Sequence, residues 1–257
     1  MQAQIEKLAA WIEKSDKVVF FGGAGVSTES GIPDFRSESG LYNAKAKYGR
    51  SPEEIISRSF FIRDPETFYA YYKENLLYPG AKPNAAHLKL AELEAAGKLR
   101  AVVTQNIDGL HQLGGSKTVH ELHGSVLRNF CMDCGAAYGL AYLLDPAHCT
   151  DKKGKAGSVP WCEKCGGMVK PDVVLYEEPL DGSVMNKAEA AIREADMLIV
   201  GGTSLVVYPA AGFLNYFKGE RLVLINKSQT EYDRRAGLVI HEAIGEVLSA
   251  VSHASSS

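Results

Sequence analysis

The feature that most constrains the fold of this chain is the alternation of short apolar segments with stretches of helical length. The apolar segments are rich in β-branched residues, which is typical of strands buried on both faces of a parallel sheet. We expect strands at residues 17–21, 100–104, 173–176, 197–201 and 221–226. We expect helices at residues 1–14, 84–96, 182–195, 209–217 and 240–250. This alternation predicts an α/β fold with a doubly wound, Rossmann-like parallel sheet and ligands beyond the carboxyl ends of the strands.

Two regions interrupt the alternation. Residues 40–78 are rich in aromatic side chains and predict an inserted group of helices, whereas 128–170 hold two cysteine pairs and many glycines. We therefore predict one unit over residues 1–257, with a second, smaller domain built from both interruptions. The Rossmann-like part takes 1–39, 84–127 and 171–257, and the small domain takes 40–83 (helical) and 128–170 (a zinc-ribbon module).

Composition excludes several classes of protein. The 257 residues are 46% hydrophobic and 23% charged, which is ordinary for a globular chain. The net charge of −3 argues against direct nucleic-acid binding, which favours basic proteins. No apolar run reaches the roughly 18–20 residues of a membrane helix, and the first 14 residues lack the pattern of a signal peptide. We expect a cytoplasmic monomer with no membrane partner.

Four of the five cysteines form two C-x2-C pairs, Cys131 with Cys134 and Cys162 with Cys165. Four thiolates suit tetrahedral zinc, and a site closed by four protein ligands is structural rather than catalytic. The 27 residues from 135 to 161 exceed the usual spacing of about 15–20, which indicates an inserted loop. Cys149 lies in that loop as a surplus thiol or a rival ligand.

The first expected strand runs into the glycine-rich turn Gly22-Gly23-Ala24-Gly25-Val26-Ser27. Such a turn can present backbone N–H groups to a phosphate, although an ordinary strand–helix turn has the same composition. It lacks the full G-x-G-x-x-G spacing, and no acidic residue ends the second strand, which argues against an ordinary NAD oxidoreductase. Phe35 and Arg36, which follow in Gly31–Arg36, could cover a flat ring and pair with a phosphate.

A second polar group follows the strand that ends at Thr104. Gln105, Asn106 and Asp108 could bind a carboxamide and ribose hydroxyls, or one of them could cap a helix. His120 and His123 come next, three residues apart. A metal pair without a third ligand is weakly indicated, whereas a histidine is a natural general base near neutral pH.

Taken in order, these motifs resemble the sirtuin family. The resemblance runs from the turn at residues 23–27 through the two cysteine pairs to Gly202-Thr203-Ser204 and Asn226. It implies an NAD-dependent protein lysine deacetylase with one structural zinc ion. On the matching positions it implies that His123 and Asn106 are catalytic. It implies NAD contacts at Gly23, Ala24, Gly25, Ser27, Asp34, Phe35, Arg36, Gln105, Asn106, Ile107, Asp108, Gly202, Thr203, Ser204, Asn226, Lys227, Ser228 and Ile244.

The resemblance also implies a reaction and a substrate. The acyl oxygen of a modified lysine attacks the ribose carbon as nicotinamide leaves, and His123 then acts as a general base on a ribose hydroxyl. That hydroxyl attacks the carbon of the O-alkylamidate formed in the first step, and hydrolysis gives free lysine and O-acyl-ADP-ribose. The acylated peptide would lie as an added strand between residues 173–176 and 202–207, with contacts at Val173, Tyr176, Val206 and Tyr72.

Two departures from the family pattern bear on the substrate. Glu177 stands where many sirtuins have a glycine, which affects the peptide-binding loop. Relatives that prefer succinyl or malonyl lysine carry Tyr-x-x-Arg, and the matching positions are Tyr72 and Asn75. Because the arginine is missing, we expect a preference for acetyl or other uncharged acyl groups.

Three alternatives stay open at this point. Mono-ADP-ribosylation, or removal of a lipoyl or long acyl chain, would use the same NAD site. A non-catalytic zinc-containing nucleotide-sensing module would explain the cysteines and glycines, but not Asn106, Asp108 and His123.

Overall fold

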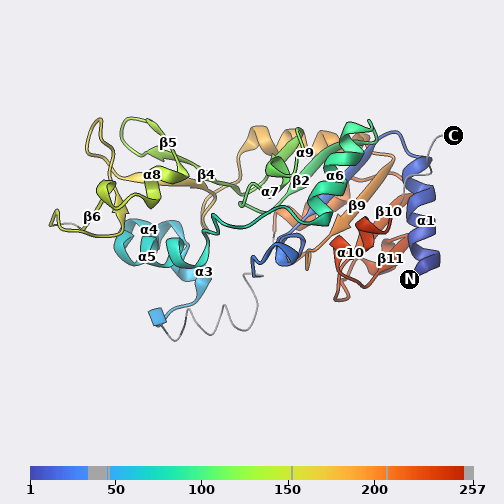
Figure 1. Cartoon of the computed structure of the whole chain (residues 1–257), viewed down its shortest axis with the longest axis horizontal. Helices are drawn as coiled ribbons and strands as arrows, with labels where there is room; N and C mark the ends of the chain where they lie inside the picture. Colours follow the sequence, from blue (N-terminus) through green and yellow to red (C-terminus); the bar gives the residue numbers. More distant parts are fainter. Residues whose placement is uncertain (34–44, 46, 152, 207, 252–257) are drawn as a thin grey trace.

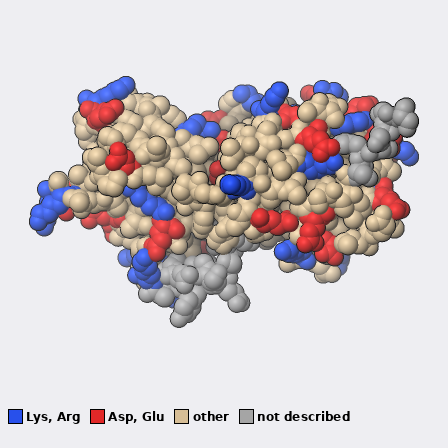
Figure 2. Space-filling model, in the orientation of Figure 1, with Lys and Arg blue, Asp and Glu red and all other residues tan. Residues whose placement is uncertain are grey.

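The computed structural model describes residues 1–33, 45, 47–151, 153–206 and 208–251. The molecule is elongated, with a parallel sheet and its covering helices at one end and a smaller domain at the other (Figure 1). Lys and Arg side chains are interspersed with Asp and Glu side chains over the face shown in Figure 2. No helix among the described residues is long and apolar enough to cross a membrane.

The large domain is built on a six-stranded sheet in which every neighbouring pair is parallel. Its strands are β1 (Val18–Gly22), β2 (Leu99–Thr104), β3 (Val119–Glu121), β9 (Met197–Gly201), β10 (Arg221–Ile225) and β11 (Leu238–Ile240). Their order is β11-β10-β9-β1-β2-β3. The chain therefore builds outward from β1 in one direction, returns to β9 beside β1, and builds outward in the other. The direction in which the chain adds strands to the sheet therefore reverses between β1 and β9, and folds of this type bind ligands at that point.

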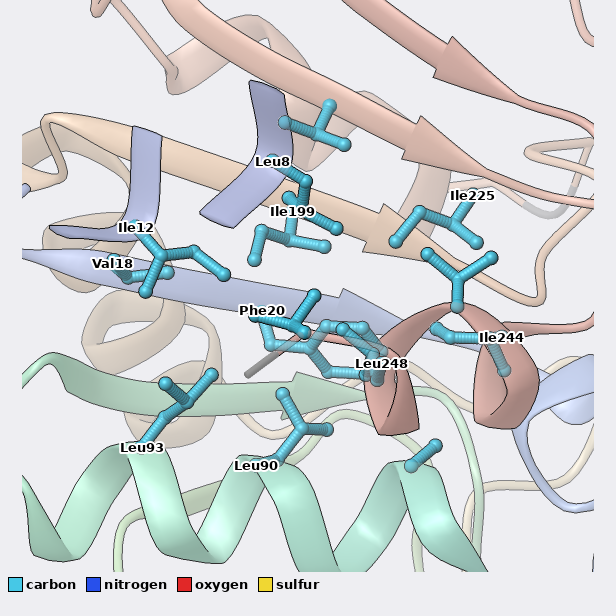
Figure 3. Packing of buried hydrophobic residues seen from close by; sticks show 14 of the residues in the cluster. Leu8, Ile12, Val18, Phe20, Leu90, Leu93, Ile199, Ile225, Ile244 and Leu248 are labelled. Carbon is cyan, nitrogen blue, oxygen red and sulfur yellow. The ribbon is translucent and has the colours of Figure 1, made fainter. Parts of the chain in front are cut away.

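Helices cover both faces of this sheet, because successive side chains of each strand point to opposite faces. Val18 and Phe20 pack on one face with α1 (Gln2–Glu13), α6 (Ala85–Ala95) and α10 (Ile244–Ser249). Figure 3 shows Leu90 and Leu93 of α6 beneath Phe20 and Val18. Val19 and Phe21 pack on the other face with α9 (Gly182–Glu194) and the 3-10 helix η4 (Ala210–Tyr216). The doubly wound α/β fold expected from the sequence is confirmed.

The smaller domain joins the two interruptions of the α/β pattern. The first contributes α3 (Pro52–Ile55), α4 (Arg58–Arg63) and α5 (Pro65–Asn75). The second contributes the antiparallel sheet β5-β4-β8, made of β4 (Gly124–Cys131), β5 (Ala137–Gly139) and β8 (Val169–Val173), with α8 (Leu140–Leu144), η3 (Pro146–His148), β6 (Cys149–Thr150) and β7 (Val159–Pro160). The shorter elements elsewhere are η1 (Ala24–Val26), η2 (Thr28–Ser30), α7 (Leu110–Leu113) and η5 (Asp233–Arg235).

One hydrophobic cluster holds the smaller domain together. Phe61, Phe68 and Tyr69 of the helical insertion are buried against Leu143 and Val169 of the cysteine-bearing segment. Their rings meet largely edge to face, with centroids of Phe61 and Phe68 4.8 Å apart. Neither insertion could bury these side chains alone, so each depends on the other. β4 and β8 extend beyond residues 128–170, and the exact division into domains stays a prediction.

Three expected elements differ in the structure. The prediction of a strand at 173–176 in the parallel sheet is wrong. The strand in this region is β8, which ends at Val173 and pairs antiparallel with β4 in the small sheet. Its apolar residues are buried next to the small domain, and an apolar run does not reveal which sheet it joins. The helix at 240–250 begins only at Ile244, because residues 238–240 form β11. The helix expected at 209–217 is a 3-10 helix.

Candidate active site

The glycine-rich turn lies at the point where the sheet reverses its order. Gly23 follows β1 and Gly202 follows β9, its neighbour in the sheet. The Gly25 N–H donates a hydrogen bond of 2.8 Å to the Gly202 carbonyl oxygen. A Cβ on Gly25 would lie 2.8 Å from the Gly202 Cα, closer than real Cβ atoms come. The two loops can approach this closely only because both residues lack side chains.

A cavity of about 850 Å³ opens at this edge and extends toward the smaller domain. Its volume is that of a site for a sizeable organic ligand. Most residues predicted from the sequence to contact NAD or substrate line it. They are Gly23, Ala24, Ser27, Gln105, Asn106, Ile107, Asp108, His123, Val173, Tyr176, Gly202, Thr203 and Ser204. The structure thus brings together loops that follow β1, β2, β3 and β9 and one segment that follows β8.

Hydrogen bonds join the polar side chains of the cavity into a network. The Ser27 hydroxyl donates to the Asp108 carboxylate at 2.7 Å and accepts from the Asn106 amide at 3.0 Å. Asp108 also accepts a hydrogen bond of 2.8 Å from the N–H of Leu110, the first residue of α7. The Gln105 amide donates to the Thr203 hydroxyl at 3.1 Å. These contacts fix the turn after β1 against the loop after β2, so the polar groups are held ready before a ligand binds.

His123 lies directly before β4, in the two-residue connection that follows β3. Its Nδ1 is 2.9 Å from the Gln105 carbonyl oxygen, and because a carbonyl only accepts, Nδ1 carries the proton. Nε2 of the neutral ring then keeps its lone pair. Burial lowers the pKa of His123 from its ordinary value, partly offset by the bond to Gln105. The ring is therefore neutral near pH 7 and can accept a proton at Nε2.

Several residues predicted as contacts lie away from this cavity. Tyr72 is fully buried, stacked on Phe68 with centroids 5.6 Å apart, and does not reach the cavity. Ile244 is part of the hydrophobic core and sits beneath Gly201. Val206 is exposed at the surface.

Three more predicted contacts follow β10, one strand further from the reversal point. They are Asn226, Lys227 and Ser228, and the Asn226 amide donates to the Ser228 carbonyl at 2.8 Å. Gly25 supports the turn through Gly202 without lining the cavity. Asp34, Phe35 and Arg36 lie outside the described residues.

Some residues that line the cavity were not predicted from the sequence. Tyr71 and Leu76 come from the helical insertion, and Leu140 comes from α8 within the cysteine-bearing segment. Helical periodicity could have pointed to Tyr71, but nothing in the sequence links Leu140 to the glycine-rich turn. Among the described lining residues the charged side chains are acidic, at Asp108, Glu177 and Glu178. No lysine or arginine stands among those described residues.

The four paired cysteines converge into one cluster in the smaller domain. The sulfur atoms of Cys131, Cys134, Cys162 and Cys165 all lie within 4.8 Å of one another. The Cys131 and Cys165 sulfurs are 3.4 Å apart, and those of Cys134 and Cys162 are 3.6 Å apart. Tetrahedral zinc with bonds of about 2.3 Å places its sulfur ligands about 3.8 Å apart, so this donor set fits zinc.

Cys149 is not part of this cluster. Its buried thiol accepts a hydrogen bond from the Lys73 ammonium group at 3.1 Å and donates to the Leu143 carbonyl at 3.5 Å. Within the described part of the chain, no group of three ligating side chains gathers around His120 and His123.

The chain is similar to known proteins over nearly its full length. The family model described as "Sir2 family" matches residues 23–209. An NAD-dependent protein deacetylase of Clostridium perfringens is 59% identical over 98% of this chain and 99% of its own length. Another NAD-dependent protein deacetylase, from Clostridium acetobutylicum, is 56% identical over 96% of this chain and 98% of its own length.

The chain is also similar to solved structures over nearly its full length. A Sir2 enzyme structure superposes with a TM-score of 0.83 at 40% identity, covering 98% of this chain and 97% of the other. A Sir2 structure determined with a deacetylated peptide and 3'-O-acetyl-ADP-ribose has a TM-score of 0.83 at 36% identity, covering 95% of both chains. One determined with a peptide and NAD+ has a TM-score of 0.81 at 35% identity, with the same coverage.

Proposed function

The chain belongs to the Sir2 family, and on that basis we propose that it removes acetyl groups from protein lysines in a reaction that consumes NAD. The products are nicotinamide, free lysine and O-acetyl-ADP-ribose, in keeping with the product bound in a related structure. The observation that carries the proposal is the placement of His123. A neutral histidine with a free Nε2 lines the same cavity as the glycine turn at the reversal point of the sheet.

The polar lining of the cavity offers two kinds of group to NAD. Ala24, Ser27 and Thr203 lie at the sheet edge, where backbone N–H and hydroxyl groups suit the phosphates and ribose of NAD. Asn106 and Asp108 offer amide and carboxylate groups that suit the nicotinamide carboxamide and a ribose hydroxyl. Bound NAD supplies an activated ribose carbon that the acyl oxygen of the lysine attacks as nicotinamide departs.

His123 would then take a proton from a ribose hydroxyl, which makes that oxygen a better nucleophile toward the acyl carbon. The bond from Nδ1 to the Gln105 carbonyl holds the ring in one tautomer and orientation. The apolar side chains of Val126 and Leu140 line the cavity and would keep water from capturing the ribose carbon, and water would enter afterwards to release the lysine amine.

The acyl group is proposed to be uncharged. The absence of lysine and arginine from the described lining residues leaves a succinyl or malonyl carboxylate without a charge-assisted partner. The Glu177 carboxylate would also repel it. Asn75, at the position where acid-preferring relatives carry the arginine, lines the cavity.

We further propose that the four-cysteine cluster binds one structural zinc ion, and that acylated proteins or peptides are the partners. All four ligands come from the protein, which leaves no open position for catalysis. The monomeric state and the cytoplasmic location remain predictions from the sequence.

The deciding experiment incubates the protein with an acetyl-lysine peptide, with and without NAD, and measures peptide mass, nicotinamide and acetyl-ADP-ribose. We expect deacetylation only with NAD and its loss in His123→Ala. A succinyl-lysine peptide, as a matched substrate, should react at least about tenfold more slowly. Release of nicotinamide while the peptide stays acetylated would instead favour another acyl group or mono-ADP-ribosylation. NAD binding without turnover would favour a non-catalytic sensing module.

A further inference from the structure

The segment from Val173 to Glu178 forms one wall of the cavity and is fastened to the helical insertion. The Tyr176 N–H donates to the Ile56 carbonyl at 3.1 Å, and the Arg58 N–H donates to the Tyr176 carbonyl at 2.9 Å. These bonds form a short parallel pairing centred on Ser57 and Tyr176. Because the Tyr176 backbone is already paired, it is closed to a peptide strand. Contact of Tyr176 with a substrate would therefore use its partly exposed side chain.

Glu177, the next residue, has an unusual backbone conformation. Its φ is 76°, in the left-handed region. Among the described residues, Glu177 and Leu205 are the non-glycine residues with a positive φ. A side chain there costs free energy that glycine would avoid. A glutamate at this position therefore needs a compensating interaction, and its carboxylate makes one.

Both oxygens of the Glu177 carboxylate bind Ser59. One accepts the Ser59 backbone N–H at 2.8 Å, and the other accepts the Ser59 hydroxyl at 2.9 Å. Ser59 is the second residue of α4, whose first N–H groups have no partner within the helix. Ser57 caps the same helix through the Phe60 N–H, so the two side chains satisfy different N–H groups. A negative charge at a helix N-terminus is favourable in addition.

The neighbouring Glu178 secures the same wall from the other side. Its carboxylate accepts the Leu175 N–H at 2.9 Å and lies 3.1 Å from the Lys170 ammonium group of β8. Arg58 approaches it to 3.5 Å. The wall is therefore held to β8 by Glu178, and to α4 by Glu177 together with the contacts of Arg58. Of the two glutamates, Glu177 alone has the strained backbone.

We propose that Glu177 is a positioning residue for the acyl-lysine substrate, acting through its two hydrogen bonds to Ser59. The inference rests on the proposed function, because it assigns the substrate side of that same cavity. The glycine turn and the Gly202–Ser204 loop belong to the parallel sheet and do not depend on this contact. Loss of the Glu177 carboxylate should therefore weaken peptide binding and leave NAD binding unchanged.

The test compares variants that separate the carboxylate from the backbone strain. Glu177→Ala keeps the free-energy cost of a side chain at positive φ and removes the carboxylate. Glu177→Gly removes both. We expect each to raise the KM for an acetyl-lysine peptide about tenfold, with the KM for NAD within about twofold of wild type. Glu177→Gln keeps one acceptor for the Ser59 N–H and should recover most of the loss, and Ser59→Ala should cost less than Glu177→Ala. Glu13→Ala, which removes an exposed carboxylate of α1, serves as the control.

A second readout needs no turnover. Hydrogen exchange of the free protein should become faster at residues 58–60 and 174–178 in Glu177→Gly, and should stay unchanged in Glu13→Ala. A wild-type peptide KM in Glu177→Gly would overturn the proposal, and so would unchanged exchange. Equal increases in the KM values for peptide and NAD would also overturn it, because they would indicate a general structural defect. If the wild-type protein shows no NAD-dependent deacetylation, the proposed function fails. Peptide affinity, measured directly by fluorescence polarisation, then decides the role of Glu177.

Discussion

The Gly25 N–H and the Gly202 carbonyl oxygen are joined by a hydrogen bond of 2.8 Å, although the two residues are far apart in the sequence. This contact lies where the sheet reverses its order, and it holds the first glycine turn against the loop after β9. Gly25 needs glycine for space, whereas Gly202, with a φ of 58°, needs it both for space and for its backbone conformation.

Gly25→Ala should therefore damage the cofactor side of the site. The added methyl group would press on the Gly202 backbone, which cannot yield as a flexible side chain could. We expect a loss of about 1–3 kcal/mol in the free energy of unfolding and at least about a tenfold weaker affinity for NAD. Thermal unfolding and NAD titration measure both. Gly182→Ala is the control, because nothing lies within 4 Å of its added Cβ; full NAD affinity in Gly25→Ala would contradict the role of this contact.

The lowered pKa of His123 predicts how the deacetylation rate depends on pH in the acidic range. Burial lowers this pKa below the usual 6.5, and the base must be neutral to act. Activity with peptide should rise as pH increases through a value below 6.5 and be level above it, so long as no other group titrates. His123→Asn can keep a donor to the Gln105 carbonyl but has no base, and its rate should fall about 10²–10⁴-fold while NAD still binds. An Asn variant with more than a tenth of the wild-type rate would argue against the base.

Two buried histidines should limit stability in acid. The rings of His87 and His111 lie with centroids 4.7 Å apart, and burial lowers the pKa of His87 to about 4 and that of His111 to about 3. Below about pH 6.5 the unfolded chain binds protons that the folded chain does not. Stability should therefore fall as pH decreases from about 6.5 toward 3–4, by up to roughly 1.4 kcal/mol per pH unit for each histidine.

His111→Leu tests this source of acid sensitivity. Neither ring nitrogen of His111 has a hydrogen-bond partner among the described residues, so an apolar side chain of similar size should be tolerated at neutral pH. Urea unfolding between pH 4 and pH 7 should show a shallower loss of stability than in wild type. An identical slope in the two proteins would mean that other groups set the acid limit.

Removal of the proposed zinc should disrupt the smaller domain before the parallel sheet. Cys131 and Cys162 belong to the same hydrophobic cluster as Phe61 and Tyr69 of the helical insertion. We expect one zinc per chain, and about tenfold or greater loss of peptide affinity after chelation, with Leu140 no longer held at the cavity. Metal analysis and peptide binding check this. Cys149→Ser should keep the metal, whereas Cys134→Ser should lose it; zinc retained in both would contradict the four-cysteine site.

Features of the protein that depend on local chemistry could be predicted from its amino-acid sequence. The apolar β-branched segments ending at Phe21, Thr104 and Gly201 required buried parallel strands, and the alternation with helices required a doubly wound sheet. The two cysteine pairs predicted a cluster of four thiolates, and the sulfur positions in the structure fit the proposed zinc ion. The side chains that follow β1, β2 and β9 could be assigned to one edge, since parallel strands end together.

Contacts between segments far apart in the chain could not be predicted and became apparent in the folded structure. The residues at 173–176 are apolar like a central strand, yet Val173 ends a strand of the small sheet and the next three residues follow it. Hydrophobicity indicates that a segment is buried but does not indicate which strand it pairs with. The strands β3 and β11 have three residues each, too few for a periodic signal. Leu140 reaches the cavity, and Glu177 binds Ser59, because the two insertions fold together around one shared core. Such contacts join residues far apart in the chain, and no spacing within either segment encodes them.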